Sequence, residues 1–249
     1  MRTGDIKVVV PARLGSKRVM VKSLRLLNGK PLISYILDTL KETKYLKNIY
    51  INSDSDYFGE IAKESGVNFY KRKPELATSE SLIDEYLYDF MVHEKCDYVA
   101  VVNPTSPFIT PEELDAAWEH FASNDFDTML CCEKIQTHCF YKGETINFSR
   151  VGKHPRSQDL EPVLALNFAI TIFDCKKFIA NYENLGWGVY TGKLGFFTTE
   201  GESNIDIDYE EDFQFAEYVA RFKGSGEKSE PQYSPIVQDL LDQNIDPRN

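Results

Sequence analysis

The chain has few of the features that mark membrane, secreted and nucleic-acid-binding proteins. No apolar run approaches the ~20 residues that a membrane-spanning helix needs, and Asp5 and Lys7 interrupt the apolar core that a signal peptide would have near the N-terminus. Basic residues are outnumbered, because 28 Lys and Arg stand against 39 Asp and Glu, for a formal net charge of -11. A nucleic-acid binder would show a basic face. We therefore expect a cytoplasmic protein that binds neither membrane nor nucleic acid.

Cysteine is also scarce, with five residues in the chain and no C-x-x-C pair. Cys131, Cys132, His138 and Cys139 are of residue types that bind zinc. Adjacent cysteines in a strand point to opposite faces, however, so Cys131 and Cys132 do not easily face one metal ion. We expect reduced, partly buried thiols rather than a zinc site.

What the chain does have is a regular alternation of two kinds of apolar pattern. Buried-strand patterns fall at residues 6–10, 49–52, 67–70, 97–102, 126–132, 167–174, 194–198 and 205–208. Helix patterns fall at about 32–40, 57–65, 82–91, 176–182, 209–222 and 236–241, and a further helix begins at Thr110, Pro111 and Glu113 with a capping box. Strands that alternate with helices predict an α/β fold with a largely parallel sheet covered on both faces.

The alternation breaks between about residues 133 and 166, where the sequence is polar and rich in turn residues. We interpret this stretch as an excursion inserted into the domain, of the kind that builds an oligomer contact or a lid. The organisation predicted is one domain over residues 1–223 that contains this excursion. Residues 224–249 follow as a polar linker and a short C-terminal helix.

The most informative stretch is a basic loop that follows the first predicted strand. Val8–Val10 end at Pro11, and Gly15 lies in the loop beyond it. Between residues 13 and 25 there are five cations and no acid: Arg13, Lys17, Arg18, Lys22 and Arg25. A strand, a glycine-containing loop and a helix form the arrangement that α/β folds use to hold phosphates. The loop predicts a site for the phosphates of a nucleotide, and a solvated basic loop is the alternative. The Walker A pattern is absent.

A pair of carboxylates forms the second candidate site. In the predicted strand at 205–208, alternation places Ile205 and Ile207 toward the core and Asp206 and Asp208 together on the other side. Two like charges at this spacing favour a divalent cation between them. Alternatively, Asp208 is a helix N-cap with Glu211 as its capping-box partner, which leaves Asp206 unexplained. A phosphate loop with a carboxylate pair suits Mg²⁺-assisted nucleotidyl transfer.

Seven blocks of the sequence carry a resemblance to a known family. They are PARLGSKR (11–18) with Lys22, LNGKPLI (27–33), RKPELA (72–77), NPTSPF (103–108), RSQDL (156–160), NFAI (167–170) and IDIDYEED (205–212). In this order, over about residues 6–220, they resemble the cytidylyltransferases that activate nine-carbon 2-keto sugar acids. These are the CMP-sialic acid synthetase family and its pseudaminic and legionaminic acid relatives.

The resemblance implies a fold, an assembly and a reaction. The fold is a three-layer α/β sandwich with a mostly parallel sheet, of the nucleotide-diphospho-sugar transferase kind related to GT-A. The assembly is a homodimer made through the excursion. The reaction is Mg²⁺-dependent, and CTP and a 2-keto sugar acid give the CMP-sugar and pyrophosphate when the anomeric hydroxyl attacks the α-phosphorus.

The resemblance also implies roles for individual residues. Those of the catalytic machinery are Arg13 and Lys22. Those matching nucleotide-binding positions are Ala12, Arg13, Ser16, Lys17, Arg72, Asn103, Pro104, Thr105 and Ser106. Those matching positions near the sugar substrate are Asn103, Arg156, Asn167 and Phe168. Those matching the Mg²⁺ ligands are Asp206 and Asp208. No residue stands out as a dedicated general base.

Several positions depart from the family pattern, mostly on the acceptor side. Phe168 replaces a small glycine, and Asn103 replaces a glutamine that is one methylene longer. The other departures are Met20 and Ser23 in the basic loop, and Tyr141, Ala165 and Thr171 around the acceptor. We expect an acceptor other than ordinary sialic acid. The alternatives are a Kdo-type or other sugar nucleotidyltransferase, and a non-catalytic paralogue that binds nucleotide or sugar.

Overall fold

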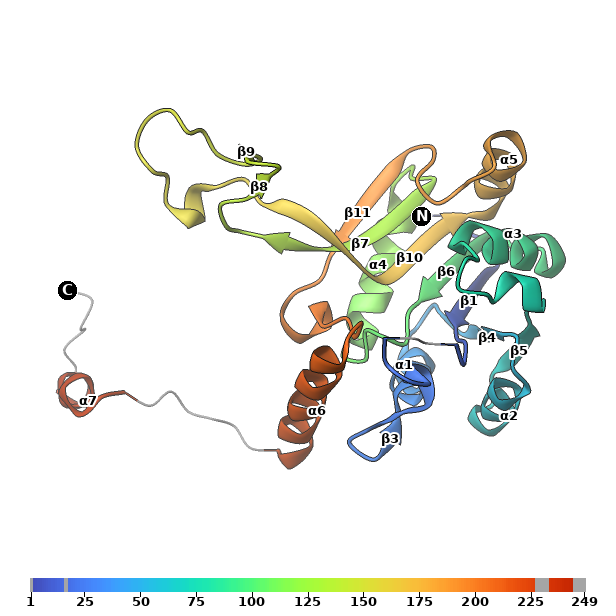
Figure 1. Cartoon of the computed structure of the whole chain (residues 1–249), viewed down its shortest axis with the longest axis horizontal. Helices are drawn as coiled ribbons and strands as arrows, with labels where there is room; N and C mark the ends of the chain where they lie inside the picture. Colours follow the sequence, from blue (N-terminus) through green and yellow to red (C-terminus); the bar gives the residue numbers. More distant parts are fainter. Residues whose placement is uncertain (1, 16–17, 227–232, 244–249) are drawn as a thin grey trace.

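The computed structural model describes residues 2–15, 18–226 and 233–243, and a seven-stranded sheet forms their centre. The strands lie in the order β11-β7-β10-β6-β1-β4-β5 (Figure 1). Their bounds are β1 Ile6–Pro11, β4 Asn48–Ser53, β5 Asn68–Lys71, β6 Tyr98–Val102, β7 Thr128–Ile135, β10 Val163–Asp174 and β11 Leu194–Thr198. Neighbouring strands pair in parallel except at β10, which is antiparallel to both β6 and β7. The mostly parallel sheet predicted from the sequence is confirmed.

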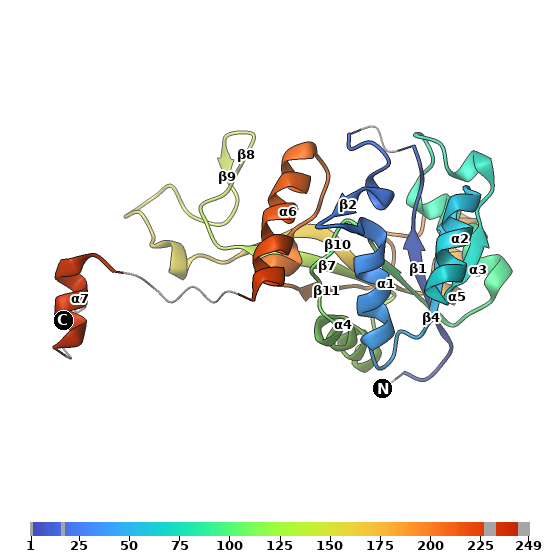
Figure 2. The same cartoon turned by 90° about the horizontal axis from the view of Figure 1, so that it is seen from below.

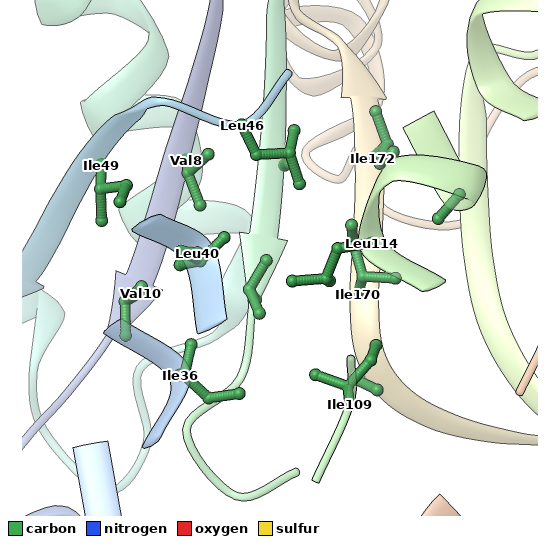
Figure 3. Packing of buried hydrophobic residues seen from close by; sticks show 14 of the residues in the cluster. Val8, Val10, Ile36, Leu40, Leu46, Ile49, Ile109, Leu114, Ile170 and Ile172 are labelled. Atoms are coloured by element: carbon green, nitrogen blue, oxygen red, sulfur yellow. The ribbon is translucent and has the colours of Figure 1, made fainter. Parts of the chain in front are cut away.

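Helices cover both faces of this sheet. They are α1 Leu32–Glu42, α2 Asp56–Ser65, α3 Ile83–Glu94, α4 Pro111–Ser123 and α5 Cys175–Leu185. Because successive side chains of a strand point to opposite faces, Val8 and Val10 of β1 pack in one cluster with α1, α2 and α4 (Figure 3). Val9 packs on the other face with α3 and α5. These two clusters make the three-layer α/β sandwich that was expected.

A third cluster attaches the last helix of the domain. In α6 (Glu210–Ser225), Phe213, Ala216 and Ala220 pack against Leu27 and Phe108. Leu27 belongs to the two-stranded hairpin of β2 (Leu26–Leu27) and β3 (Lys30–Pro31), which follows the short 3₁₀ helix η1 (Lys22–Leu24). Figure 2 shows α6 beside this hairpin. The packing brings the segment before α6 next to the basic loop after β1.

The predicted strand at 205–208 is wrong. After the 3₁₀ helix η4 (Gly201–Asn204) the segment is extended, but it pairs with no strand in the described part of the chain. It lies against the loop after β6, where the Ile207 amide donates to the Thr105 carbonyl at 2.9 Å. Ile207 is fully buried and Asp206 and Asp208 are not. The predicted alternation of side chains is therefore correct, because successive side chains of an extended segment point to opposite sides whether or not the segment belongs to a sheet.

The excursion has a regular stem. β7 and β10 both run beyond the strands predicted at 126–132 and 167–174, and they pair with each other from Val163 opposite Ile135 to Leu166 opposite Cys132. The excursion then holds the small hairpin of β8 (Phe140–Tyr141) and β9 (Glu144–Thr145) and the 3₁₀ helix η3 (Ser157–Asp159). Figure 1 shows the β8–β9 end projecting away from the helices that cover the sheet.

Two helices occupy the C-terminal part of the described chain. α6 continues to Ser225, and a short helix, α7 (Pro235–Asp242), confirms the helix expected at 236–241. Residues 227–232 of the predicted linker lie outside the described residues. Among the helices that the structure describes, none combines the length and apolar content required to cross a membrane.

The capping box at the start of α4 gives a stability prediction. The Thr110 hydroxyl accepts the Glu113 amide at 3.2 Å, and the Glu113 carboxylate accepts the Thr110 amide at 2.9 Å. Thr110→Ala should lower the free energy of unfolding by about 1 kcal/mol, because an amide at the helix start loses its partner. Thr110→Ser keeps the hydroxyl and is the matched control, and urea denaturation measures both. An equal loss in the two variants would show that the methyl group matters and the cap does not.

Candidate functional site

The strand order reverses next to β1, and the candidate site lies at that point. From β1 the chain passes outward to β4 and β5 and then crosses back to β6 on the other side of β1. Because β1 and β6 are parallel neighbours, the loops that follow them lie side by side at the carboxyl ends of the strands, where open α/β sheets hold their ligands. Two adjoining cavities lie at this edge of the sheet. We call them the first and the second cavity.

The first cavity has a volume of about 630 Å³ and is strongly cationic. Four cations line it, and no Asp or Glu of the described chain does: Arg13, Arg18, Lys22 and Arg72. Ala12 contributes from the loop after β1, and Asn103, Pro104 and Thr105 contribute from the loop after β6. In a chain with a net charge of -11, such a cavity attracts anionic ligands such as phosphates.

Arg72 is held rigidly at one end of the first cavity. It is 4% exposed, its Nε donates to Asn52 Oδ1 at 2.6 Å, and its Nη2 donates to the Asn52 carbonyl at 2.9 Å. The guanidinium carbon lies 4.1 Å from the ring centroid of Tyr86. Burial lowers the pKa of Arg72 and raises the pKa of Tyr86 to about 12. A guanidinium remains charged in proteins, so Arg72 offers a planar, pre-oriented set of donors.

Asp89 on α3 holds the strand end that carries Arg72. It accepts the Tyr70 hydroxyl at 2.7 Å and the Lys73 ammonium at 2.7 Å, on either side of Arg72 in the chain. Burial alone would raise the pKa of Asp89, but the hydrogen bonds from Lys73 and Tyr70 outweigh it and hold this pKa below its ordinary value.

The second cavity, of about 310 Å³, shares Ile83, Asn103 and Thr105 with the first. Asp206 and Asp208 line one part of it. Its apolar part consists of Ile83, Phe168, Val189 and Tyr190. The Asp84 carboxylate of α3 accepts the amides of Gly188 and Val189 at 2.6 and 3.0 Å, which fixes this loop at the cavity.

A bulge in β10 carries Phe168 into the second cavity. The register with β7 shifts between Leu166 and Thr171, and Phe168 has a φ of 54°. The left-handed region is unfavourable for a bulky side chain, at about 1–3 kcal/mol. The Phe168 carbonyl accepts Asn103 Nδ2 at 2.7 Å, and the Ala169 amide donates to Asn167 Oδ1 at 3.2 Å. The surrounding hydrogen bonds thus stabilise the strained backbone.

Asp208 connects the carboxylate pair to the cationic loop. Its Oδ1 lies 2.9 Å from Arg18 Nη2 and 3.3 Å from Lys22 Nζ, and Lys22 also donates to the Ile207 carbonyl. The alternative of Asp208 as the N-cap of α6 is wrong. Tyr209 holds that position, and the Asp212 carboxylate accepts the amides of Asp208 and Tyr209 at 3.0 and 2.8 Å. The Asp208 carboxylate is therefore free of a capping role.

Asp206 and Asp208 fit a site for a magnesium ion. Burial raises the pKa of Asp206, a hydrogen bond with Thr105 opposes that rise, and the nearby Asp208 charge adds to it. A cation beside these groups would favour the ionised form of Asp206. No three His, Cys, Asp or Glu residues of the described chain cluster as metal ligands. Two carboxylates completed by water and phosphate oxygens are the donor set that Mg²⁺ commonly takes.

The two cavities bring together most of the residues singled out from the sequence. Those lining the first cavity are Ala12, Arg13, Lys22, Arg72, Asn103, Pro104 and Thr105. Those lining the second are Asn103, Thr105, Asn167, Phe168, Asp206 and Asp208. Ser106 is buried and lines neither cavity, although its amide donates to the Asn103 carbonyl at 3.2 Å. Ser16 and Lys17 lie outside the described residues.

Arg156 is not brought to either cavity of its own chain. It lies on the excursion, its side chain is 70% exposed, and it pairs with Asp159 at 2.7 Å. Conversely, Tyr86, Val189 and Tyr190 line the cavities without having been singled out. No motif marks these three residues, because their places depend on how α3 and the loop after α5 pack.

Comparisons with known proteins identify the family of the chain. The model of a family described as "Cytidylyltransferase" matches residues 7–234. An N-acylneuraminate cytidylyltransferase of Streptococcus agalactiae serotype III (strain NEM316) is 30% identical over 221 residues, which are 82% of this chain and 51% of the relative. The chain thus spans about half the length of the curated relatives of this kind that it matches.

Two further similarities cover nearly the whole of the matched protein. The post-translational flagellin modification protein B of Campylobacter coli is 24% identical over 88% of this chain and 96% of that protein. Among solved structures, a CMP:2-keto-3-deoxy-manno-octonic acid synthetase complexed with CTP has a TM-score of 0.64 at 15% identity. That match covers 88% of this chain and 99% of the other. The structural likeness supports the expected nucleotidyltransferase fold.

The ion pair and hydrogen bond at Asp89 predict an acid-dependent contribution to stability. Asp89→Asn should lower the free energy of unfolding by about 1–2 kcal/mol near pH 7. Because the folded-state pKa of Asp89 is depressed, its contribution is complete above about pH 3.9, the ordinary value for Asp, and is lost as the pH falls through the folded-state pKa. Urea denaturation between pH 3 and 7 measures the difference from wild type. Asp125→Asn, at a carboxylate that is 88% exposed, is the control, and a difference at Asp89 that does not shrink with acid would contradict the assignment.

Proposed function

The chain belongs to the cytidylyltransferase family, and from this premise we propose that it transfers the cytidylyl group of CTP to a nine-carbon 2-keto sugar acid. The family and the nucleotidyltransferase class expected from the sequence are confirmed by the family match and by the streptococcal relative. The observation that carries the proposal is the meeting of two cavities of different character. A cavity lined by four cations adjoins one lined by two carboxylates, and Asn103 and Thr105 belong to both.

The first cavity is suited to CTP. Arg72 and Tyr86 at one end offer fixed donors and an aromatic face to a base, and Arg13, Arg18 and Lys22 offer charge to the phosphates. Asn103 and Thr105, which border both cavities, mark the place where the α-phosphorus would lie. The sugar acid would occupy the second cavity with its anomeric hydroxyl toward this junction.

The ion pairs of Asp208 suggest how the charges rearrange on binding. Arg18 and Lys22 contact Asp208 at 2.9 and 3.3 Å. Phosphate oxygens entering the first cavity would compete with Asp208 for these cations and release its carboxylate. Lys22 would then donate to the phosphates, where it stabilises the charge that develops during transfer.

Asp206 and Asp208 are the residues that would hold Mg²⁺. A bound Mg²⁺ neutralises phosphate charge and lowers the pKa of a nearby hydroxyl. The hydrogen bond between the Thr105 side chain and the Asp206 carboxylate would help to orient this carboxylate toward the ion.

We also propose a homodimer through the excursion. Four large apolar side chains on it are more than half exposed: Phe140, Tyr141, Ile146 and Val151. Several large exposed apolar side chains on one projecting segment favour an interface there. A dimer through the excursion would account for Arg156, which the resemblance places at the substrate and which lies outside both cavities of its own chain.

The departures around the second cavity support an acceptor other than N-acetylneuraminic acid. Pyrophosphate release from CTP and Mg²⁺, measured with sialic, legionaminic, pseudaminic and Kdo-type acids, tests the activity and the acceptor together. We expect turnover with one nonulosonic acid and none when EDTA removes the Mg²⁺. A KM for N-acetylneuraminic acid as low as for any other sugar would refute the acceptor assignment. If the protein binds CTP but releases no pyrophosphate with any of these sugar acids, a non-catalytic paralogue would be favoured.

Lys22 gives a sharper test of the mechanism. Lys22→Ala should lower kcat by about 10²-fold or more, because the ammonium acts on charge that develops in the transition state. Lys30→Ala is the control, since it removes the same charge from a hairpin residue that pairs with Asp38 at 2.5 Å and lines neither cavity. Steady-state kinetics on the accepted sugar distinguish the variants. Equal kcat in the two variants would remove Lys22 from the catalytic residues.

A further inference from the structure

The side chain of Phe168 has no role in the core of the described chain. It is half-buried, it belongs to none of the three hydrophobic clusters, and its ring contacts no other aromatic ring of the described residues. Its φ of 54° is costly for a bulky residue. Stability alone therefore does not account for a phenylalanine here.

The backbone holds this ring in the second cavity. Asn103 donates to the Phe168 carbonyl at 2.7 Å, and the Asn103 amide donates to the Ala169 carbonyl at 3.2 Å. Asn167, on the other side, donates to Thr199 Oγ1 at 2.8 Å. Strained residues that their surroundings hold in this way cluster at ligand sites, and bulges near such sites re-aim a side chain.

The chemistry of the cavity indicates what the ring would meet. Phe168 lies with Ile83, Val189 and Tyr190 in the apolar part of the wall. The charged groups that line the cavity within the described chain are Asp206 and Asp208, both anionic. The polar side chains of the lining are Asn103, Thr105, Asn167 and Thr171. A hydroxyl-rich group turned toward the Phe168 ring and away from these side chains would lose its hydrogen bonds to water without replacement. A methyl group, on a deoxygenated carbon or at the end of an acyl group, has no hydrogen bonds to water to lose.

We propose that Phe168 is the specificity-determining residue of the second cavity. It favours a 2-keto sugar acid that turns a deoxygenated or acylated part toward the ring, and it disfavours one that places a hydroxylated chain there. This inference rests on the proposed function, because it takes the second cavity as the acceptor site. It names the acceptor class that this chain selects.

The inference can be tested without turnover by measuring how tightly each sugar binds to protein that is saturated with CDP and free of Mg²⁺. By calorimetry the wild type should bind legionaminic or pseudaminic acid about tenfold or more tightly than N-acetylneuraminic acid. Phe168→Gly should reduce this ratio to about threefold or less through a gain for N-acetylneuraminic acid. Its Tm should not fall below the wild-type value, since glycine adopts this φ freely.

Two control variants separate the ring from the strained backbone. Phe168→Leu keeps an apolar side chain at the same φ and should keep the wild-type ratio. Lys95→Gly relieves a φ of 51° at the C-terminal end of α3, at an exposed residue that lines neither cavity, and should leave the ratio unchanged. A Phe168→Gly protein with a lowered Tm and the wild-type ratio would overturn the inference, because the ring would then only pack.

Pyrophosphate release, measured in parallel, separates this inference from the proposed function. Turnover by the wild type with a ratio that Phe168→Gly leaves unchanged refutes the inference alone. The predicted change in the binding ratio without pyrophosphate release from any sugar refutes the proposed activity and supports the inference. Failure of the wild type and of Phe168→Gly to bind any of the three sugars refutes both.

Discussion

The placement of β10 between β6 and β7 is the constraint on which the rest of the molecule depends. β10 pairs antiparallel with both neighbours in a sheet whose other pairs are parallel. Its first residues form the stem of the excursion with β7, and its last residues belong to the central sheet. The bulge between these two parts lies at the second cavity. One strand thus links the excursion, the sheet and the site, and a shift of its register would move all three.

The first cavity has the opposite charge to the protein as a whole. The chain carries a net charge of -11, yet four cations meet in the first cavity. Arg18 and Lys22 are paired with Asp208, while Arg72 is held by the neutral groups of Asn52 and Tyr86. The two kinds of cation suit different tasks. A cation paired with a carboxylate can exchange partners, whereas a cation fixed by neutral groups keeps its geometry and can discriminate between ligands.

Much of the site was predicted from the sequence, and the rest depended on distant packing. The cationic loop and the alternating carboxylates were found because their patterns lie within a few residues. Even the wrong strand at 205–208 left the carboxylates correctly oriented, because extended backbone alternates in or out of a sheet. Val189 and Tyr190 were missed because the hydrogen bonds of Asp84 on α3, and no local motif, place their loop.

The sequence by itself determined the alternation of strands and helices up to α6 apart from the strand predicted at 205–208, the capping box of α4 and the charged groups available for chemistry. These features depend on periodicity, helix caps and charge, all of which act over a few residues.

Only the tertiary structure decided which groups meet. Arg18 and Asp208 are 190 residues apart in the chain, and the N-cap role open to Asp208 was excluded only when Tyr209 and Asp212 were seen to cap α6. Likewise, the ring of Phe168 lines a cavity because the crossover from β5 to β6 brings the loop of Asn103 beside the bulge of β10. Contacts of this kind depend on the topology of the whole sheet, which no local pattern contains.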